Sequence, residues 1–428
     1  MIETPSQEEI RKSLKASLWD GIFGSLTVGL AEIYFSPFVL FLGAPPLLFG
    51  LLTTLPQLIG SLSQLSSPRL VDFLRSPKKT VLWGAFGQAL LLVGTAFIPF
   101  SPRFRLAFFF LANSLYWICW MIALPAWQSW MGDLVPPDER GRYFGLRNRI
   151  LQISTFLALL AGGWILDRSQ NHEATAYGGF FLLFLLGASG RLLSCLAISR
   201  QTDLQAPAAS TRPSFTAFLK NLTRHSFGLF VLYSTLFSLA VNIAGPYFIS
   251  YLLEEIRFSY LQFMVLMGAM VLAKFLSLPL WGRASDRSGP LKPFLLSSLL
   301  FSILPFFWLA SRQFYYLLFL HLFAGAALAG FELCSFHFLL GNTERENRTY
   351  GAAYYETLAG VGVVCGSVLG GLLLRHPLFG IKAYLSLFLI SGVLRMLLSL
   401  SLLPKIQKAS TRASLKASEL APIWEPKP

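Results

Sequence analysis

Charge is scarce in this chain of 428 residues, because only 13% of the residues are Asp, Glu, Lys or Arg. A soluble domain usually carries about 25% charged residues. The rest is strongly apolar, with 54% hydrophobic residues and a mean hydropathy of +0.58. The stretches between the long apolar runs are too short to fold as soluble domains of their own. The composition therefore excludes an ordinary water-soluble protein and indicates a chain built for lipid.

Cysteine and histidine are also few. The four cysteines lie inside apolar runs without metal-type spacing, at Cys119, Cys195, Cys334 and Cys365. We expect them to be small apolar packing residues rather than disulfides or zinc ligands. The five histidines show no arrangement of nucleophile, base and metal that a membrane-embedded enzyme would need. We therefore predict no metal, no cofactor and no enzyme.

Two further signals are missing. The sequence has no Gly-x-x-x-x-Gly-Lys-Ser/Thr loop, so any active transport would draw on a gradient rather than on nucleotide hydrolysis. No cleavable signal peptide is apparent, because the polar start at Ser6–Glu9 leads into a full-length apolar run. That start is a candidate helix-capping box. We expect the first span to act as its own insertion signal.

What the chain does contain is a series of apolar runs of about 20 residues, the length of a membrane-spanning helix. They predict an all-α membrane protein with twelve spans. The spans cover residues 18–42, 47–67, 80–100, 104–131, 146–167, 178–200, 226–253, 259–281, 291–310, 313–340, 350–374 and 378–402.

The basic residues set the expected topology. The formal net charge is +14, but most of the 35 lysines and arginines lie in the two terminal segments and in alternate short loops rather than in one folded patch. This distribution argues against a nucleic-acid partner. By the positive-inside rule it predicts a multi-pass protein of the plasma (inner) membrane with both termini cytoplasmic.

Several short patterns occur twice, in the same order and about 210 residues apart, as expected for a duplicated chain. The matched positions are Asp72 and Asp286, Tyr34 and Tyr247, Arg142 and Arg348, Arg191 and Arg395, and Gly162–Gly163 and Gly370–Gly371. We therefore predict two homologous halves of six spans each. The expected organisation is an N-terminal segment 1–17, a first bundle 18–200, a linker 201–223, a second bundle 226–403 and a tail 404–428, disordered from Lys405.

The later loop, Gly282–Gly289 followed by Lys292, resembles the mark of the major facilitator superfamily, Gly-x-x-x-Asp-Arg/Lys-x-Gly with trailing basic residues. The earlier loop keeps Asp72 but has Pro68 and Arg75 where the family has glycine. The resemblance covers about residues 15 to 403. It implies two pseudo-symmetric six-helix bundles around a central cavity, the major facilitator fold.

The resemblance implies that the repeated loop forms a cytoplasmic gate. A carboxylate at a short turn can accept hydrogen bonds from the positively polarised start of a nearby helix. Asp72 and Asp286 are the predicted acceptors, and the resemblance implies that Asp133 and Arg142 complete the network of the first half. In the later loop, Arg287 is the predicted basic residue of the gate. The alternative is that these are ordinary topology-setting loop charges.

Ionisable residues inside spans are costly unless they face water or a partner, so they are candidates for function. The main candidates for the cavity are Glu32, Lys274 and Glu332. The alternatives are a protonated, hydrogen-bonded acid for Glu32 and snorkelling toward the cytoplasm for Lys274. Asp20, Arg191, Arg395 and Glu356 are interpreted mostly as structural, because they lie nearer the cytoplasmic boundary.

Polar and aromatic side chains in spans one, four and seven complete the candidate set. Tyr34, Asn242 and Tyr247 lie at a depth compatible with the cavity, although each could equally bridge two helices. Span four carries Tyr116 and Trp120 within an aromatic stripe that would either stack on a ring-bearing solute or pack in the protein.

These features predict a secondary transporter that moves a small solute by alternating access, with Glu32 and Glu332 as proton-coupling groups. The expected partners are a small-molecule substrate, protons and the lipid bilayer, and the expected state is a monomer. A non-transporting sensor or a membrane-embedded lipid-modifying enzyme with the same fold is the alternative. The substrate and the direction of transport do not follow from the residues.

Overall fold

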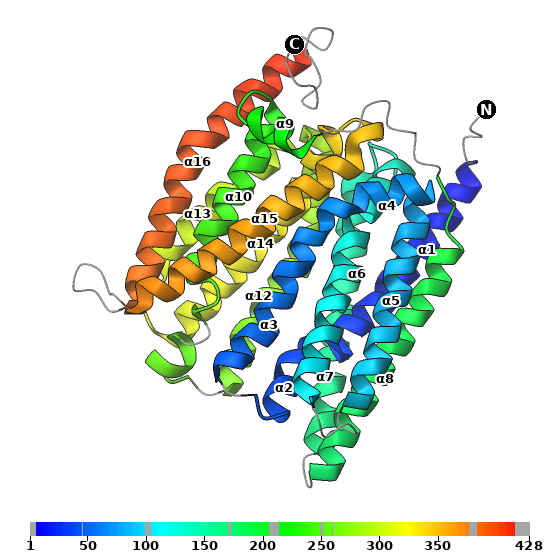
Figure 1. Cartoon of the computed structure of the whole chain (residues 1–428). Helices are drawn as coiled ribbons and strands as arrows, with labels where there is room; N and C mark the ends of the chain where they lie inside the picture. The colour runs from blue at the N-terminus through cyan, green and yellow to red at the C-terminus, as the bar shows by residue number, and fades with distance from the viewer. Residues whose placement is uncertain are drawn as a thin grey trace. The chain divides into compact units, whose positions relative to one another are not determined.

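Long helices dominate the computed structural model, which describes residues 6–44, 46–98, 104–169, 173–204, 214–248, 251–258, 260–375 and 383–415. These residues form helices and connecting turns without a strand (Figure 1). Within them, ten helices are long and apolar enough to cross a membrane, and Leu291–Phe307 is a shorter apolar helix. The prediction of an all-α membrane protein is thus confirmed, whereas the number of twelve membrane spans stays a prediction.

The helices divide between two compact units. Unit 1 comprises Met1–Pro137 and Ile150–Ala208, and unit 2 comprises Asp138–Arg149 and Ala209–Pro428. The main helices of unit 1 are α1 (Gln7–Leu30), α2 (Phe35–Phe41), α3 (Pro46–Ser63), α4 (Ser67–Leu74), α5 (Pro77–Phe97), α6 (Arg105–Leu134), the larger part of α7 (Arg140–Ser169) and α8 (Glu173–Ser199). The first turns of α7 belong to unit 2.

Unit 2 continues with seven further α-helices in the described residues. They are α9 (Phe215–Lys220), α10 (Ser226–Ala244), α12 (Tyr260–Ser288), α13 (Leu291–Phe307), α14 (Phe314–Gly341), α15 (Arg348–Arg375) and α16 (Ala383–Leu415). A short π-helical turn, η4, covers Tyr251–Glu255. Helix α9 lies inside the segment predicted as a linker, of which residues 205–213 fall outside the described residues.

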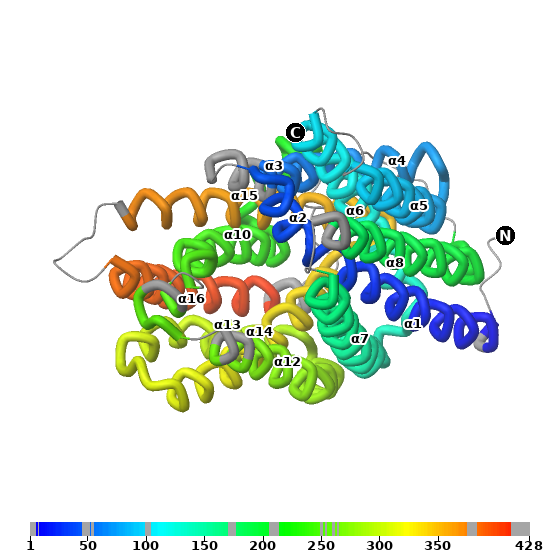
Figure 2. The backbone as a smooth tube through the Cα atoms, turned by 90° about the horizontal axis from the view of Figure 1, so that it is seen from below, coloured from blue at the N-terminus to red at the C-terminus, as the bar shows by residue number. Residues whose placement is uncertain are grey.

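The two units pack their helices in the same order. In unit 1, α1 contacts α8, α8 contacts α5, α5 contacts α6 and α6 contacts α3. In unit 2, α10 contacts α16, α16 contacts α13, α13 contacts α14 and α14 contacts α12. Figure 2 allows this sequence of neighbours to be followed within each unit. Each helix of the second series is the repeat partner of its counterpart in the first, so the duplicated sequence folds into a duplicated arrangement.

The first helix of each half is interrupted. Helix α1 stops at Leu30, a 3-10 turn covers Glu32–Tyr34, and α2 starts at Phe35. The predicted span 18–42 is therefore not one continuous helix. Pro37 explains the break, because proline has no N–H to bond the carbonyl four residues earlier and its ring clashes with that carbonyl. Pro246 comes just after the end of α10 at Ala244 and likewise has no N–H to continue the helix, so the predicted span 226–253 is also broken.

Aromatic side chains fill the core of unit 1 around this break. The ring of Phe35 lies edge-on to Tyr116, with 5.2 Å between ring centroids, and edge-on to Phe109 at 5.9 Å. Tyr116 is only 2% exposed. Edge-to-face contacts of this kind fix ring orientation. The core thereby holds the Tyr116 side chain in one position at the start of α2.

The end of the chain differs from the prediction. Helix α16 continues without interruption to Leu415, so disorder from Lys405 was wrong for residues 405–415. This stretch contains no glycine or proline, and seven of its eleven residues are lysine, arginine, alanine, glutamine or leucine, which all favour helix. Residues 416–428 of the predicted tail lie outside the described residues.

Candidate functional site

A carboxyl group sits at the break in the first span. Glu32 is the first residue of the 3-10 turn, and its half-buried carboxylate accepts a hydrogen bond from the Tyr116 hydroxyl, 3.1 Å from Oε2. Non-helical backbone at membrane depth occurs where it is packed in protein or lines a cavity. Transporter sites are typically built at such discontinuous helices. The structure thus places this predicted residue at the interrupted helix of unit 1.

A buried arginine accompanies this acid. Arg191, on α8, is 7% exposed and lies close enough to interact electrostatically with Glu32. Its guanidinium carbon stands 5.3 Å from the ring centroid of Trp120, in a cation–π arrangement. Sequence reasoning treated Arg191 as structural because it judged depth and repeat position alone. Its position inside a span of a charge-poor chain was the signal that could have identified it.

The same arginine connects to a second acid. Arg191 Nη1 donates to Ser194 Oγ at 3.4 Å, and Ser194 Oγ donates to Asp20 Oδ1 at 2.7 Å. Asp20 is 6% exposed. Buried charges persist when they are paired and hydrogen-bonded. Unit 1 therefore holds one cation between two carboxylates, and protonation of either acid would change the balance of charge around Arg191.

Unit 2 brings two of the predicted residues together. Lys274 of α12 and Glu332 of α14 form an ion pair, with 2.6 Å between Nζ and Oε2. The Lys274 side chain is 17% exposed and that of Glu332 48% exposed, so the pair opens on one side. The indole of Trp281 also ties these two helices by donating to the carbonyl of Ala326 at 2.8 Å. Sequence separation gave no indication that the two would meet.

The three polar residues of spans one and seven bond to main-chain oxygens. The hydroxyl of Tyr34 donates to the carbonyl of Leu159 at 2.7 Å, and that of Tyr247 donates to the carbonyl of Ser367 at 2.6 Å. Asn242 donates to Ser238 within its own helix. The two tyrosines thus occupy equivalent places in the two units and join equivalent helices. The contacts of the two tyrosines are those expected of the bridging alternative that the sequence left open, whereas the Asn242 contact stays within α10.

Asp286 binds the start of a helix. Its two carboxylate oxygens accept from the backbone N–H groups of Gly141 and Arg142, at 2.7 and 2.8 Å. These groups lie in the first turn of α7, where unbonded N–H groups carry partial positive charge. The backbones of Gly141 and Gly282 touch at this point, so a Cβ on either residue would collide with the other's carbonyl oxygen. This contact accounts for the leading glycine of the loop pattern.

Arg142 joins this contact through its main-chain N–H, and the side chains of the other predicted gate residues are placed as follows. Arg142 presents its side chain on the exposed surface of α7, and Arg287 is exposed in the last turn of α12. Asp72, in α4, and Asp133, near the end of α6, are half-buried residues of unit 1. Asp286 has the expected helix-start geometry within unit 2.

Comparison with known proteins gives the family. The sequence profile of the Major Facilitator Superfamily matches residues 21–240 and again residues 230–426. No curated protein matches the sequence. The same profile matches each half of the chain, which agrees with the duplication inferred from the residues.

Solved structures with the same fold are distant in sequence. A bacterial homologue of the iron transporter ferroportin, outward-facing, is 14% identical with a TM-score of 0.72, over 94% of this chain and 100% of that chain. The E. coli fucose:proton symporter FucP is 16% identical with a TM-score of 0.70, over 91% and 98%. The human organic anion transporter MFSD10 (TETRAN) is 16% identical with a TM-score of 0.71, over 94% and 100%. The chain belongs to the Major Facilitator Superfamily and is a multi-pass membrane transporter.

Proposed function

We propose that this protein is a proton-coupled secondary transporter that moves a small solute by alternating access between its two halves. The observation that carries the proposal is the Glu32 carboxylate at the broken first span, hydrogen-bonded to Tyr116 and facing the charge of Arg191. An ionisable group inside a membrane span marks an ion or substrate path by default. Two solved structures that share the fold, FucP and XylE, are described as proton symporters of sugars.

The hydrogen bonds suggest how Glu32 would couple the two movements. When ionised, its carboxylate accepts from Tyr116 and attracts Arg191; when protonated, it loses that attraction and gains a donor of its own. Arg191 then depends more on the Ser194–Asp20 side of the cluster. Proton binding therefore redistributes contacts between α1, α6 and α8. Such a change biases a conformational equilibrium only if the two states differ in these contacts.

The ion pair of unit 2 is the second element of the proposal. Lys274 and Glu332 neutralise each other on α12 and α14, and the half-exposed carboxylate can exchange its partner for a solute or a proton. In this scheme Glu32 carries the coupled proton, and the Lys274–Glu332 pair contacts the solute. Asp286 at the start of α7 supplies the cytoplasmic gate, opened when its hydrogen bonds break.

The test is solute-driven proton movement. Purified protein is reconstituted in proteoliposomes that contain a pH-sensitive dye, and monosaccharides, organic anions, organic cations and amino acids are added in turn outside. A transported solute changes the internal pH, and Glu32→Gln removes this signal while counterflow exchange of the solute persists. Glu346→Gln, an exposed acid in a short turn, is the matched control and retains both signals.

Two outcomes oppose the proposal in different ways. Undiminished proton movement in Glu32→Gln removes Glu32 from coupling but leaves transport in place. A solute that raises the thermal stability of the protein but never crosses the membrane would instead indicate a sensor.

A further inference from the structure

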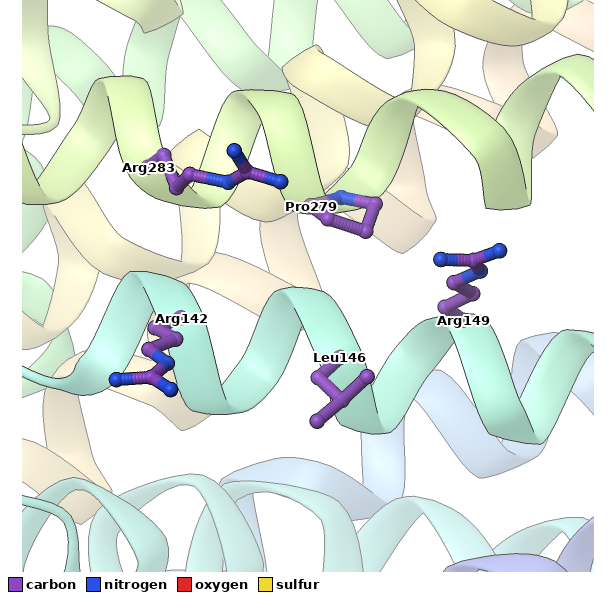
Figure 3. A pocket seen from close by; sticks show the side chains of 5 residues that line it. All are labelled: Arg142, Leu146, Arg149, Pro279 and Arg283. Carbon is purple, nitrogen blue, oxygen red and sulfur yellow. The ribbon is translucent and has the colours of Figure 1, made fainter.

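A pocket of about 510 Å³ lies between the first turns of α7 and the end of α12, entirely within unit 2. Its lining consists of Arg142, Leu146 and Arg149 from α7 and of Pro279 and Arg283 from α12 (Figure 3). Figure 3 shows the side chain of Arg149 directed from α7 toward α12 and that of Arg283 extended along α12 toward Pro279. Arg142 lies in the first turn of α7 and points away from α12 in this view.

In the described part of the chain, the lining of the pocket contains arginines but no acidic residue. Among the described residues, the guanidinium groups of Arg142, Arg149 and Arg283 have no ion pair with a carboxylate. The nearby Asp286 carboxylate is occupied by the main-chain N–H groups at the start of α7. Guanidinium groups bind phosphate and carboxylate oxygens through paired N–H donors. Like charges held together without an acid favour an anionic occupant.

Apolar surface continues from this basic pocket. Leu146, which lines the pocket, is 52% exposed. On α12, Leu272, Leu276 and Leu280 are 43%, 52% and 62% exposed. These three leucines recur every four residues, so they form one stripe along the helix. The stripe leads away from Arg283 along α12 and offers a surface for hydrocarbon chains. A soluble anion would gain nothing from it, whereas an amphiphile would use both parts.

We propose that this pocket binds an anionic phospholipid, with the headgroup phosphate between Arg149 and Arg283 and the acyl chains along the leucine stripe. Arg142 adds to the positive potential of the pocket near the start of α7. The topology predicted from the basic loops places this end of α12 in the cytoplasmic leaflet, where anionic lipids are enriched. The bound lipid would brace the junction that Asp286 makes with α7. The proposal does not depend on proton coupling.

The test compares three probes on the purified full-length protein in mild detergent. Phosphatidylglycerol, phosphatidylcholine and inorganic phosphate are titrated at equal concentration, and binding is followed by native mass spectrometry and by thermal unfolding. Phosphatidylglycerol is expected to bind and to raise the unfolding temperature, while phosphatidylcholine and phosphate do neither. Arg149→Gln and Arg283→Gln should each weaken phosphatidylglycerol binding roughly fivefold, from about 1 kcal/mol per basic residue near an anionic lipid.

Arg11→Gln is the control, because it removes an exposed arginine of the same expected membrane side from α1. It should leave phosphatidylglycerol binding unchanged. Equal responses to phosphatidylcholine, or unchanged phosphatidylglycerol binding in both pocket variants, would overturn the proposal. A shift produced by inorganic phosphate alone would also overturn it, because it would identify a site for a soluble anion. The unfolding temperature without lipid shows whether each variant is folded.

Discussion

The ammonium group of Lys274 lies 2.6 Å from the Glu332 carboxylate and thereby joins α12 to α14. The lysine is mostly buried, whereas half of the glutamate side chain is exposed. An ion pair of this kind keeps both charges compatible with a low-dielectric surrounding. Replacing only one member of the pair therefore destabilises the protein more than replacing both.

Lys274→Met is expected to lower the free energy of unfolding by about 1–2 kcal/mol, less than for a fully buried pair because Glu332 is half exposed. The double variant Lys274→Met with Glu332→Gln should recover part of this loss. Thermal unfolding of the single and double variants measures the coupling as a double-mutant cycle. Additive losses in the cycle would show that the two side chains do not interact.

Loss of the Asp286 contact with α7 should change hydrogen exchange at the start of α7. Asp286→Ala leaves the N–H groups of Gly141 and Arg142 without their acceptor, which should cost about 1–3 kcal/mol. Hydrogen exchange measured by mass spectrometry should accelerate in residues 138–149 and stay unchanged in α10. Gly282→Ala should disturb the same segment, because its methyl group would meet the Gly141 carbonyl.

Protection of residues 138–149 that is the same in Asp286→Ala as in the unaltered protein would contradict this role. Arg287→Ala provides the comparison, since Arg287 is exposed in the last turn of α12 without an ion pair in the described part of the chain.

The repeat-related tyrosines should respond alike. Tyr34→Phe and Tyr247→Phe each remove one hydroxyl that donates to a carbonyl of the neighbouring helix. Each loss should reduce stability by about 0.5–1.5 kcal/mol, the net value of one hydrogen bond. Both hydroxyls also lie against glycine pairs, Gly162–Gly163 and Gly370–Gly371, so the rings themselves stay in place. Thermal unfolding that separates the two variants by more than this range would refute their equivalence.

The sequence sufficed for features that depend on composition and repetition. Long apolar runs defined the helices, and matched positions such as Tyr34 and Tyr247 anticipated equivalent contacts in the two units. Pro37 and Pro246 marked possible bends, but the predicted spans 18–42 and 226–253 ran across both breaks, because the sequence remains apolar on both sides of each proline. Partnerships were also hidden: nothing local to Arg191 shows that its helix brings it to Glu32. Such pairings arise from tertiary packing rather than from periodicity.

The two repeat-related arginines differ in their surroundings. Because Tyr34 corresponds to Tyr247, the position of Asp20 corresponds to Tyr233 and that of Glu32 to Gly245. The second half has therefore kept the arginine and lacks both acids. Arg395 is 5% exposed, and its guanidinium donates to the carbonyls of Phe301 and Val241 and lies over the Phe301 ring. In the described part of the chain it has no ion pair.

We therefore expect opposite responses to the same substitution. Arg191→Met leaves the buried carboxylate of Asp20 and the half-buried carboxylate of Glu32 without their cation and should cost about 3–5 kcal/mol. Arg395→Met exchanges a desolvated charge for an apolar chain of similar length and leaves no acid behind, so its effect should lie within about 1 kcal/mol of neutral. Chemical or thermal unfolding of the two variants in the same detergent measures the difference. Equal losses would mean that Asp20 and Glu32 do not depend on Arg191 for their charge balance, and the cluster of unit 1 would then be three independent side chains.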